Sequence, residues 1–118
     1  MDPLELSREL LRRYSVRDLD GLIEMFSEDV NYRRTDGRVL VGREAVRAQY
    51  ETDWSMTENA QATLVRGAVA HRTVFAEVAI GSDHPVKWQL DAVAVHDWST
   101  SGTMSHYRLY SDAPRVIT

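Results

Sequence analysis

The chain has 118 residues, 43 % of them hydrophobic and 27 % charged, which predicts one globular domain (1–118) and excludes disorder as the default state. Its formal net charge of −4 gives no long-range attraction to nucleic acid, and the absence of cysteine excludes disulfides and thiolate metal sites. The first residues lack a basic region followed by an apolar one, and no stretch approaches the roughly 20 apolar residues of a membrane span, so we expect a cytoplasmic protein without a membrane partner.

Two helices are predicted at the N-terminal end. Asp2 can cap the first, with Pro3 at its first position and Glu5 closing a capping box. One face of this helix is apolar and carries Leu4, Leu10, Leu11 and Tyr14. Asp18 can cap the second helix by accepting an unpaired backbone N–H. Its apolar residues follow at i, i+3, i+4 and i+7, and they are Leu19, Leu22, Ile23 and Phe26.

A hairpin and a third helix come next. Residues 30–35 alternate with period two, Asp36-Gly37 is a strong turn signal, and residues 38–41 form the return strand. The third helix is predicted from about residue 42 to 54. Its buried face has four-residue spacing and consists of Val46, Tyr50 and Trp54.

The rest of the chain is predicted to be strands separated by turns. The expected strands are 60–71, 73–81, 86–98 and 103–111, and the tail after Asp112 is expected to be loose. Helices first and antiparallel strands last indicate an α+β fold, with the helices on one face of a curved sheet.

Three segments resemble the SnoaL-like and ketosteroid isomerase-like families of the NTF2-like superfamily. They are 17–22 (RDLDGL), 25–30 (MFSEDV) and 41–46 (VGREAV), and the resemblance continues through Asp91 to the final strand ending at 108–112. It implies a cone-shaped α+β barrel, with three helices on a strongly curved, mostly antiparallel sheet. It also implies a conical pocket for a small organic molecule and a homodimer formed through the outer face of the sheet. One such fold hosts many chemistries.

The resemblance also sets which strand residues face the pocket, because neighbours in a strand point to opposite faces. It places Tyr32 and Arg34 inward on the first strand. On the later strands it places inward Gln89, Asp91 and Val93, with Met104, His106, Arg108 and Tyr110 opposite them. For residues 73–81 we expect Glu77 outward and, inward, Val74, Ala76, Val78 and Ile80.

Asp91 and His106 are the predicted acid/base pair. The resemblance matches Asp91 to the acid that ketosteroid isomerases keep protonated to donate a hydrogen bond to an oxyanion. Asp91 could instead pair with Arg34 or Arg108, and would then stay ionised. His106 titrates near neutrality and could be a general base or a hydrogen-bonded wall residue.

The sequence departs from both enzymes of this superfamily to which we compare it. Arg34 stands where ketosteroid isomerases have their proton-shuttling carboxylate, and Leu10 stands where they have a helix-one tyrosine. Tyr32 matches a tyrosine of limonene epoxide hydrolases, but Arg34 replaces their asparagine and Arg108 occupies the expected position of one acid. Neither mechanism is therefore reproduced.

The remaining assignments complete the predicted site and surface. Tyr32 is expected to donate a hydrogen bond in catalysis. The predicted substrate-binding residues are Arg34, Arg108, Gln89, Tyr14, Trp54 and Tyr110. The histidines predicted at the surface or an interface are His71, His84 and His96. Trp88 is expected either to be a packing residue or to form an outer-face dimer contact together with Leu90 and Ala92. The four histidines lack paired ligand spacing, so neither a metal nor an organic cofactor is expected.

Two functions follow from this reading. The first is a SnoaL-like enzyme that isomerises, cyclises or ring-opens a hydrophobic oxygenated molecule, such as a polyketide or terpenoid, by acid/base chemistry. The second is a non-catalytic ligand-binding or dimerisation module that holds a carboxylated ligand through its arginines. The enzymatic mechanism requires residues 32, 34, 91, 106 and 108 to converge in one dry cavity.

Overall fold

The computed structural model describes residues 1–117, which form three helices and one seven-stranded sheet. The helices are α1 (Pro3–Ser15), α2 (Leu19–Ile23) and α3 (Arg43–Met56). The strands are β1 (Phe26–Arg33), β2 (Val39–Val41), β3 (Gln61–Ala70), β4 (Thr73–Ser82), β5 (Trp88–Trp98), β6 (Met104–Ser111) and β7 (Arg115–Val116). The strand order is β2-β1-β6-β5-β4-β3, with β7 paired to β5. Among these strands only β1 and β6 run parallel, so the predicted α+β class and mostly antiparallel sheet are confirmed.

The predicted helix caps are present, but the second helix is shorter than expected. Asp2 accepts a hydrogen bond from the backbone N–H of Glu5 at 2.9 Å. Asp18 caps α2 by accepting from the backbone N–H of Gly21 at 3.0 Å. The helix ends at Ile23, and Phe26 opens β1 as a fully buried residue. Placing Phe26 on the helix was wrong, because the apolar spacing fits a buried strand start as well as a helical face.

One turn and the C-terminal tail each bring two strands together. The Asp36-Gly37 turn forms as predicted, with Gly37 at φ +86° and the backbone N–H of Arg34 donating to the carbonyl of Arg38 at 2.8 Å. The tail predicted to be loose instead forms β7, where Arg115 pairs with Gln89 of β5. This added strand places a guanidinium on the outer face of the sheet.

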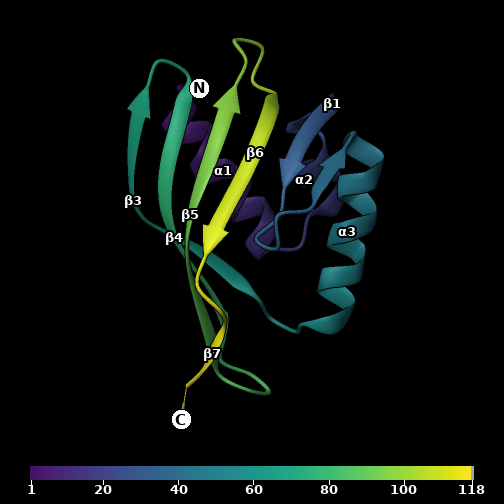
Figure 1. The fold of residues 1–118 in the computed structure, drawn as a ribbon, viewed down its shortest axis with the longest axis vertical. Coiled ribbons are helices and arrows are strands. Elements are labelled where there is room, and N and C mark those ends of the chain that lie inside the picture. Colours follow the sequence, from purple (N-terminus) through teal and green to yellow (C-terminus); the bar gives the residue numbers. More distant parts are fainter. Residues whose placement is uncertain (118) are drawn as a thin grey trace.

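The sheet has one face buried under the helices and one face open to solvent (Figure 1). On β4 the predicted facing is confirmed: Val74, Ala76 and Val78 are buried, and Glu77 points outward to an ion pair with Arg66 at 3.1 Å. Residues that pair across two neighbouring strands point to the same face of the sheet. By this rule the facing of β4 sets the facing of β5, and β5 sets that of β6.

That rule reverses the predicted facing of β5 and of most of β6. Leu90 pairs with inward Ile80, and Tyr107 pairs with buried His96, so both point inward. Asp97 pairs with His106 and Trp98 with Met104, which leaves Ser105 as an extra, bulged residue. The bulge shifts the alternation by one residue.

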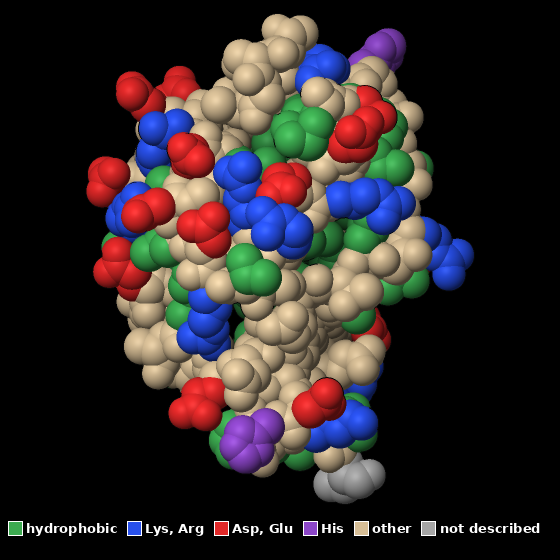
Figure 2. Space-filling model, turned by 180° about the vertical axis from the view of Figure 1, so that it is seen from behind, with side chains coloured by type: hydrophobic (Ala, Val, Ile, Leu, Met, Phe, Trp, Pro, Cys, Tyr) green, Lys and Arg blue, Asp and Glu red, His purple; other side chains and the backbone are tan. Residues whose placement is uncertain are grey.

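The core fills the space between the helices and the inner face of the sheet. Its fully buried side chains include those of Leu22, Ile23, Phe26, Val30, Val46 and Met104. On the helical side, acidic and basic side chains are interspersed rather than separated into patches of one sign (Figure 2). None of the helices within residues 1–117 is long and apolar enough to cross a membrane.

Candidate functional site

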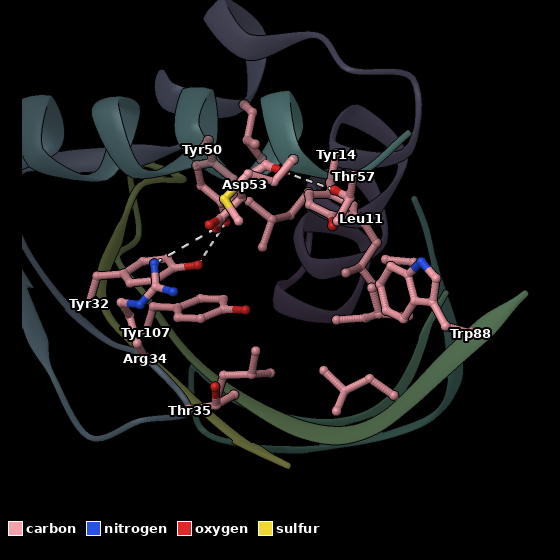
Figure 3. A pocket seen from close by; sticks show the side chains of 17 residues that line it. Leu11, Tyr14, Tyr32, Arg34, Thr35, Tyr50, Asp53, Thr57, Trp88 and Tyr107 are labelled. Atoms are coloured by element: carbon pink, nitrogen blue, oxygen red, sulfur yellow. Dashed lines mark hydrogen bonds and ion pairs between the residues drawn. The ribbon is translucent and has the colours of Figure 1, made fainter. Parts of the chain in front are cut away.

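A cavity of about 300 Å³ lies between the helices and the inner face of the sheet. Helices α1 and α3 line one side of it, and strands β1, β4, β5 and β6 line the other. Its polar side chains gather at the end near β1 and α3, and Trp88 stands across the cavity from them (Figure 3). The cavity therefore has one polar and one apolar end, a division typical of sites for small organic molecules.

The centre of the polar end is a cluster of four tyrosines from four elements. Tyr32 of β1 pairs in register with Tyr107 of β6, and their rings stack with centroids 4.2 Å apart and an interplanar angle of 5°. The Tyr32 hydroxyl donates a hydrogen bond to the hydroxyl of Tyr50 on α3 at 3.1 Å (Figure 3). Tyr14 of α1 meets the Tyr50 ring edge-on at 6.1 Å. These ring contacts fix the positions of the phenols.

These phenols are hydrogen-bond donors. Burial raises the pKa of Tyr32, Tyr50 and Tyr107 well above the usual tyrosine value, because the interior disfavours a phenolate. All three therefore carry their protons at neutral pH. Since Tyr32 donates to Tyr50, the Tyr50 proton remains for another acceptor. The polar end thus offers O–H donors to an oxygen atom of a ligand.

Arg34 and Asp53 complete the polar end. The Arg34 Nη1 lies 3.8 Å from the Asp53 Oδ2, and its Nε lies 3.9 Å from the Asp36 Oδ2. Both distances exceed a hydrogen bond, and within residues 1–117 the buried Nε finds no hydrogen-bond partner. The other carboxylate oxygen of Asp53, Oδ1, accepts from the Gln49 amide at 2.9 Å. The Arg34 guanidinium and the Asp53 carboxylate therefore lie side by side at the cavity without a direct hydrogen bond between them.

The opposite end of the cavity is apolar. Ile80 of β4 and Leu90 of β5 are neighbours in register, and they line it with Trp88, Leu109 of β6 and Leu11 of α1. Burying a hydrocarbon ring here is favourable at roughly 25 cal/mol per Å² of apolar surface. The geometry suits a molecule with a hydrophobic body and an oxygen at one end.

A buried polar network supports the tyrosine cluster from behind. The Trp98 Nε1 donates to the Ser7 Oγ at 3.0 Å, and the Ser7 Oγ lies 2.8 Å from the His96 Nδ1. The Ser7 hydroxyl therefore links the Trp98 indole to the His96 imidazole. Burial lowers the pKa of His96 to about 4, so the ring is neutral. It stacks on Tyr107 with centroids 5.3 Å apart, and the prediction of His96 as a surface residue was wrong.

Asp91, the predicted acid, lies on the outer face of the sheet with its side chain 52 % exposed. Gln89, also predicted in the pocket, donates to its Oδ1 at 2.8 Å, and Arg115 donates to its Oδ2 at 2.8 Å. These two contacts lower the pKa of Asp91, the Gln89 bond contributing most, so it stays ionised. The predicted inward placement of both residues was wrong, because the resemblance set the facing of β5 one residue out of phase.

The predicted base and its neighbours on β6 also point outward. The His106 side chain is 53 % exposed, and Arg108 donates to Asp97 on the outer face at 3.4 Å. The Tyr110 ring lies under the Arg33 guanidinium at 5.0 Å. Their predicted placement in the pocket was wrong because of the Ser105 bulge. Val93 of β5 pairs with Tyr110 and is exposed, because the facing of β5 was predicted one residue out of phase.

Three predicted residues do line the cavity: Tyr32, Arg34 and Tyr14. Trp54 packs against the rings of Tyr14 and Tyr50, at 5.7 Å from each, and stands behind the lining. The predicted dimer contact of Trp88, Leu90 and Ala92 was wrong, since all three face inward. His71 and His84 are exposed at turns, as predicted.

The prediction missed the lining residues Tyr50, Asp53, Tyr107 and Trp88. A signal for two of them exists in the sequence. Tyr107 and Trp88 fall at the apolar positions of alternating strands, which indicates the inner face. In the part of the chain that the structure describes, no three His, Cys, Asp or Glu side chains converge as metal ligands.

Comparison with known proteins gives a family and a set of similar folds. The family model described as "SnoaL-like domain" matches residues 7–108. The epoxide hydrolase/cyclase-like enzyme SalBIII of pyran ring formation in polyether salinomycin is 19 % identical, with a TM-score of 0.85 over 98 % of this chain and 95 % of that one.

Two further structures have the same fold. An LEH-like epoxide hydrolase of M. tuberculosis is 15 % identical, with a TM-score of 0.79 over 93 % of this chain and 82 % of that one. A computationally designed binder of 17-OHP is 16 % identical, with a TM-score of 0.83 over 100 % and 98 %. No protein of curated function matches the sequence. At these identities the structures are evidence for the fold alone.

Proposed function

The chain belongs to the SnoaL-like domain family, and from this premise we propose that it is a cofactor-independent enzyme that moves a proton on a hydrophobic, oxygenated small molecule. The substrate would be polyketide- or terpenoid-like. The observation that carries the proposal is the set of buried, protonated phenols beside a carboxylate on one cavity. It replaces Asp91 and His106, whose outward side chains cannot reach a substrate in this cavity.

In the proposed reaction, the phenols hold an oxygen and Asp53 moves the proton. A substrate carbonyl accepts hydrogen bonds from Tyr50 and Tyr107. The Asp53 carboxylate takes a proton from the carbon next to the carbonyl, and the C–H electron pair shifts to give an enolate whose oxygen the phenols stabilise. Asp53 then returns the proton to another carbon. The net change is an isomerisation that consumes no other reactant.

The same groups also suit ring closure or ring opening. Asp53 would accept the proton of an attacking hydroxyl, and Tyr50 would donate a hydrogen bond to the oxygen released from the ring carbon. That oxygen would then take the proton from Asp53, which restores the carboxylate. The similarity to an epoxide hydrolase/cyclase-like enzyme and to an epoxide hydrolase supports this class of reaction. In each version Arg34 places a positive charge beside the Asp53 carboxylate, at 3.8 Å.

Hydrogen exchange tests the proposal without knowledge of the natural substrate. Cyclic ketones such as 1-tetralone and 4-chromanone are incubated with the protein in D₂O, and deuterium uptake next to the carbonyl is followed by mass spectrometry. We expect exchange above the buffer rate for ketones that bind. Asp53→Asn should lower the rate about 10²-fold or more, and Tyr50→Phe by about tenfold, as for other general bases and oxyanion donors.

Asp91→Asn is the matched control, because it removes the same charge from an arginine-paired aspartate on the outer face. Its exchange rate should equal that of the unmodified protein. Ketones that bind in the cavity and yet exchange no faster than in buffer would contradict the proposal. The same result would support the second candidate, a non-catalytic binding module, which the outward placement of the predicted acid and base favours.

A further inference from the structure

Arg17 follows helix α1 in a backbone conformation that usually belongs to glycine. Its φ is +57°, in the left-handed region. The backbone N–H of Arg17 donates to the carbonyl of Tyr14 at 3.1 Å, and that of Asp18 donates to the carbonyl of Arg13 at 3.0 Å. These two bonds form a Schellman motif, whose left-handed residue is most often glycine because a Cβ atom is disfavoured there. An arginine at this position indicates that its side chain contributes something that glycine cannot.

The Arg17 side chain reaches the C-terminal end of α3. Its Nη1 donates to the carbonyl of Trp54 at 3.0 Å, and its Nη2 donates to the carbonyl of Thr57. The guanidinium also lies 5.7 Å from the centroid of the Trp54 ring, as a cation–π contact. The last turn of α3 contains no basic residue of its own, so Arg17 supplies the positive charge that stabilises this end of a helix. One side chain thus ties the α1–α2 connection to the end of α3.

That end of α3 carries the proposed base. Asp53 lies in the last turn, where the negative end of the helix disfavours a carboxylate. Thr57 closes the helix by donating its N–H and its hydroxyl to the Asp53 carbonyl, at 3.1 and 2.9 Å. Trp54, the next residue, packs its ring against that of Tyr50 at 5.7 Å. The backbone that Arg17 holds therefore sets the positions of both the carboxylate and a phenol of the polar end.

We propose, on the basis of the function proposed above, that Arg17 is a positioning residue, which holds the end of α3 so that Asp53 and Tyr50 meet the same substrate. Arg17 is not among the residues that line the cavity, so it acts through these two groups and does not touch the substrate. The planar guanidinium suits this role, because its fixed fork of N–H groups can donate to two carbonyls at once, whereas a lysine ammonium has no such fork. A displacement of about 1 Å in a catalytic group can lower a rate about 10²-fold.

Arg17→Gly tests this role, because glycine suits the left-handed backbone and the change removes only the side chain. We expect the variant to stay folded, with a melting temperature within about 5 °C of that of the unmodified protein. Deuterium uptake by saturating 1-tetralone in D₂O should nevertheless fall about tenfold or more. The affinity for 1-tetralone, measured by isothermal titration calorimetry, should change by less than about threefold, because a misplaced base lowers the rate at saturation more than the binding.

Two further variants separate positioning from a general loss of stability. Arg17→Lys keeps the charge without the fork and should restore part of the rate. His71→Gly relieves an equal positive φ, of +56°, at the exposed β3–β4 turn outside the cavity lining, and should leave the rate unchanged. Backbone amide exchange locates the effect. Residues 50–57 should exchange faster in Arg17→Gly than in the unmodified protein, whereas the strands of the sheet should not change.

Each result supports or contradicts the positioning role. Arg17→Gly with the full rate, or with unchanged amide exchange at residues 50–57, would overturn it. Amide exchange that rises throughout the protein would also overturn it, because Arg17 would then only stabilise the fold. If Arg17→Gly does not fold, Arg17→Lys decides in its place, and a rate equal to that of the unmodified protein would refute the need for the fork.

The proposed enzymatic function fails through a different result. It fails when the unmodified protein promotes no deuterium uptake in a ketone that it binds. The hold of Arg17 on the end of α3 is then decided by the amide exchange of residues 50–57 alone, since that measurement needs no substrate.

Discussion

Strands β5 and β6 carry two sets of side chains that alternate in sequence and differ in burial, charge and contacts. On the inner face, His96 and Tyr107 are buried, neutral and stacked on one another. On the outer face, Asp91 and His106 are more than half exposed, and Asp91 is paired with a guanidinium. Titratable residues here follow the ordinary rule that charges stay in water.

The difference between the two faces of the sheet shows where chemistry is possible in this molecule. The outer face holds the residues that look catalytic in the sequence, but water and ion pairs leave them with ordinary reactivity. The inner face holds residues that resemble packing aromatics, and desolvation makes them strong, fixed hydrogen-bond donors. The identity of a side chain therefore says less about function than the face on which it lies.

Two tyrosines of β6 allow the sharpest test of this difference in stability. Tyr107→Ala removes a buried ring stacked on Tyr32 and His96, and we expect it to lower the free energy of unfolding by about 3–5 kcal/mol. Tyr110→Ala removes a ring of the same size that is 47 % exposed, and should cost less than about 1 kcal/mol. Urea denaturation followed by circular dichroism measures both, and equal losses would contradict the assigned facing.

The pH dependence of stability distinguishes the two histidines. Burial gives His96 a folded pKa of about 4 against the ordinary histidine pKa of 6.5, so the unfolded chain binds its proton first as the pH falls. The contribution of neutral His96 to the free energy of unfolding is then fully present above pH 6.5 and declines towards pH 4. The loss should reach about 3 kcal/mol, at 1.36 kcal/mol for each unit of pKa difference. Denaturant titrations at intervals of pH measure it.

One glutamine variant of each histidine separates the contributions of His96 and His106 to the pH dependence. His96→Gln removes the buried group that must be protonated, so its stability should change little between pH 6.5 and 4, although the protein is less stable throughout. His106→Gln should keep the full pH dependence, because the His106 side chain is 53 % exposed. An unchanged slope in His96→Gln would refute the buried neutral imidazole.

The sequence predicted the elements and their order well, because caps, turns and apolar periods are local signals. Asp2, Asp18 and Gly37 all act as expected, and Tyr32 and Arg34 reach the cavity. The extra strand β7 was missed, since its two residues gain their structure from pairing with β5 and not from their own sequence.

The candidate site was predicted less well than the order of the elements, and β5 shows why. Its residues alternate polar at Gln89, Asp91 and Asp97 and apolar at Trp88 and Leu90. That pattern favours the apolar set inward. Matching Asp91 to a relative's catalytic acid overrode it and reversed the face of the strand. A one-residue shift of this kind moves every side chain to the other side.

The bulge in β6 could not be read from the sequence. Met104 and Tyr107 are both buried although three positions apart, which strict alternation forbids. Ser105 absorbs the difference as the unpaired residue. Asp53 was missed for another reason: the predicted helix included it, but only the tertiary packing of α3 beside β1 brings it to Arg34.

The outer face gives the prediction with the smallest effect on stability. The homodimer implied by the family resemblance stays a prediction, and exposed apolar residues on this face, Phe75, Val93 and Tyr110, are where a second copy would bind. Val93→Asp places a charge among them and should change the free energy of unfolding of the monomer by less than about 0.5 kcal/mol. Sedimentation velocity should nevertheless show the dimer replaced by monomer.

Val86→Asp, an equal substitution at a 52 % exposed residue of the β4–β5 turn, should leave association unchanged. If both variants stay dimeric, the copies meet elsewhere, and the contrast between the two faces of the sheet would concern ligand binding alone.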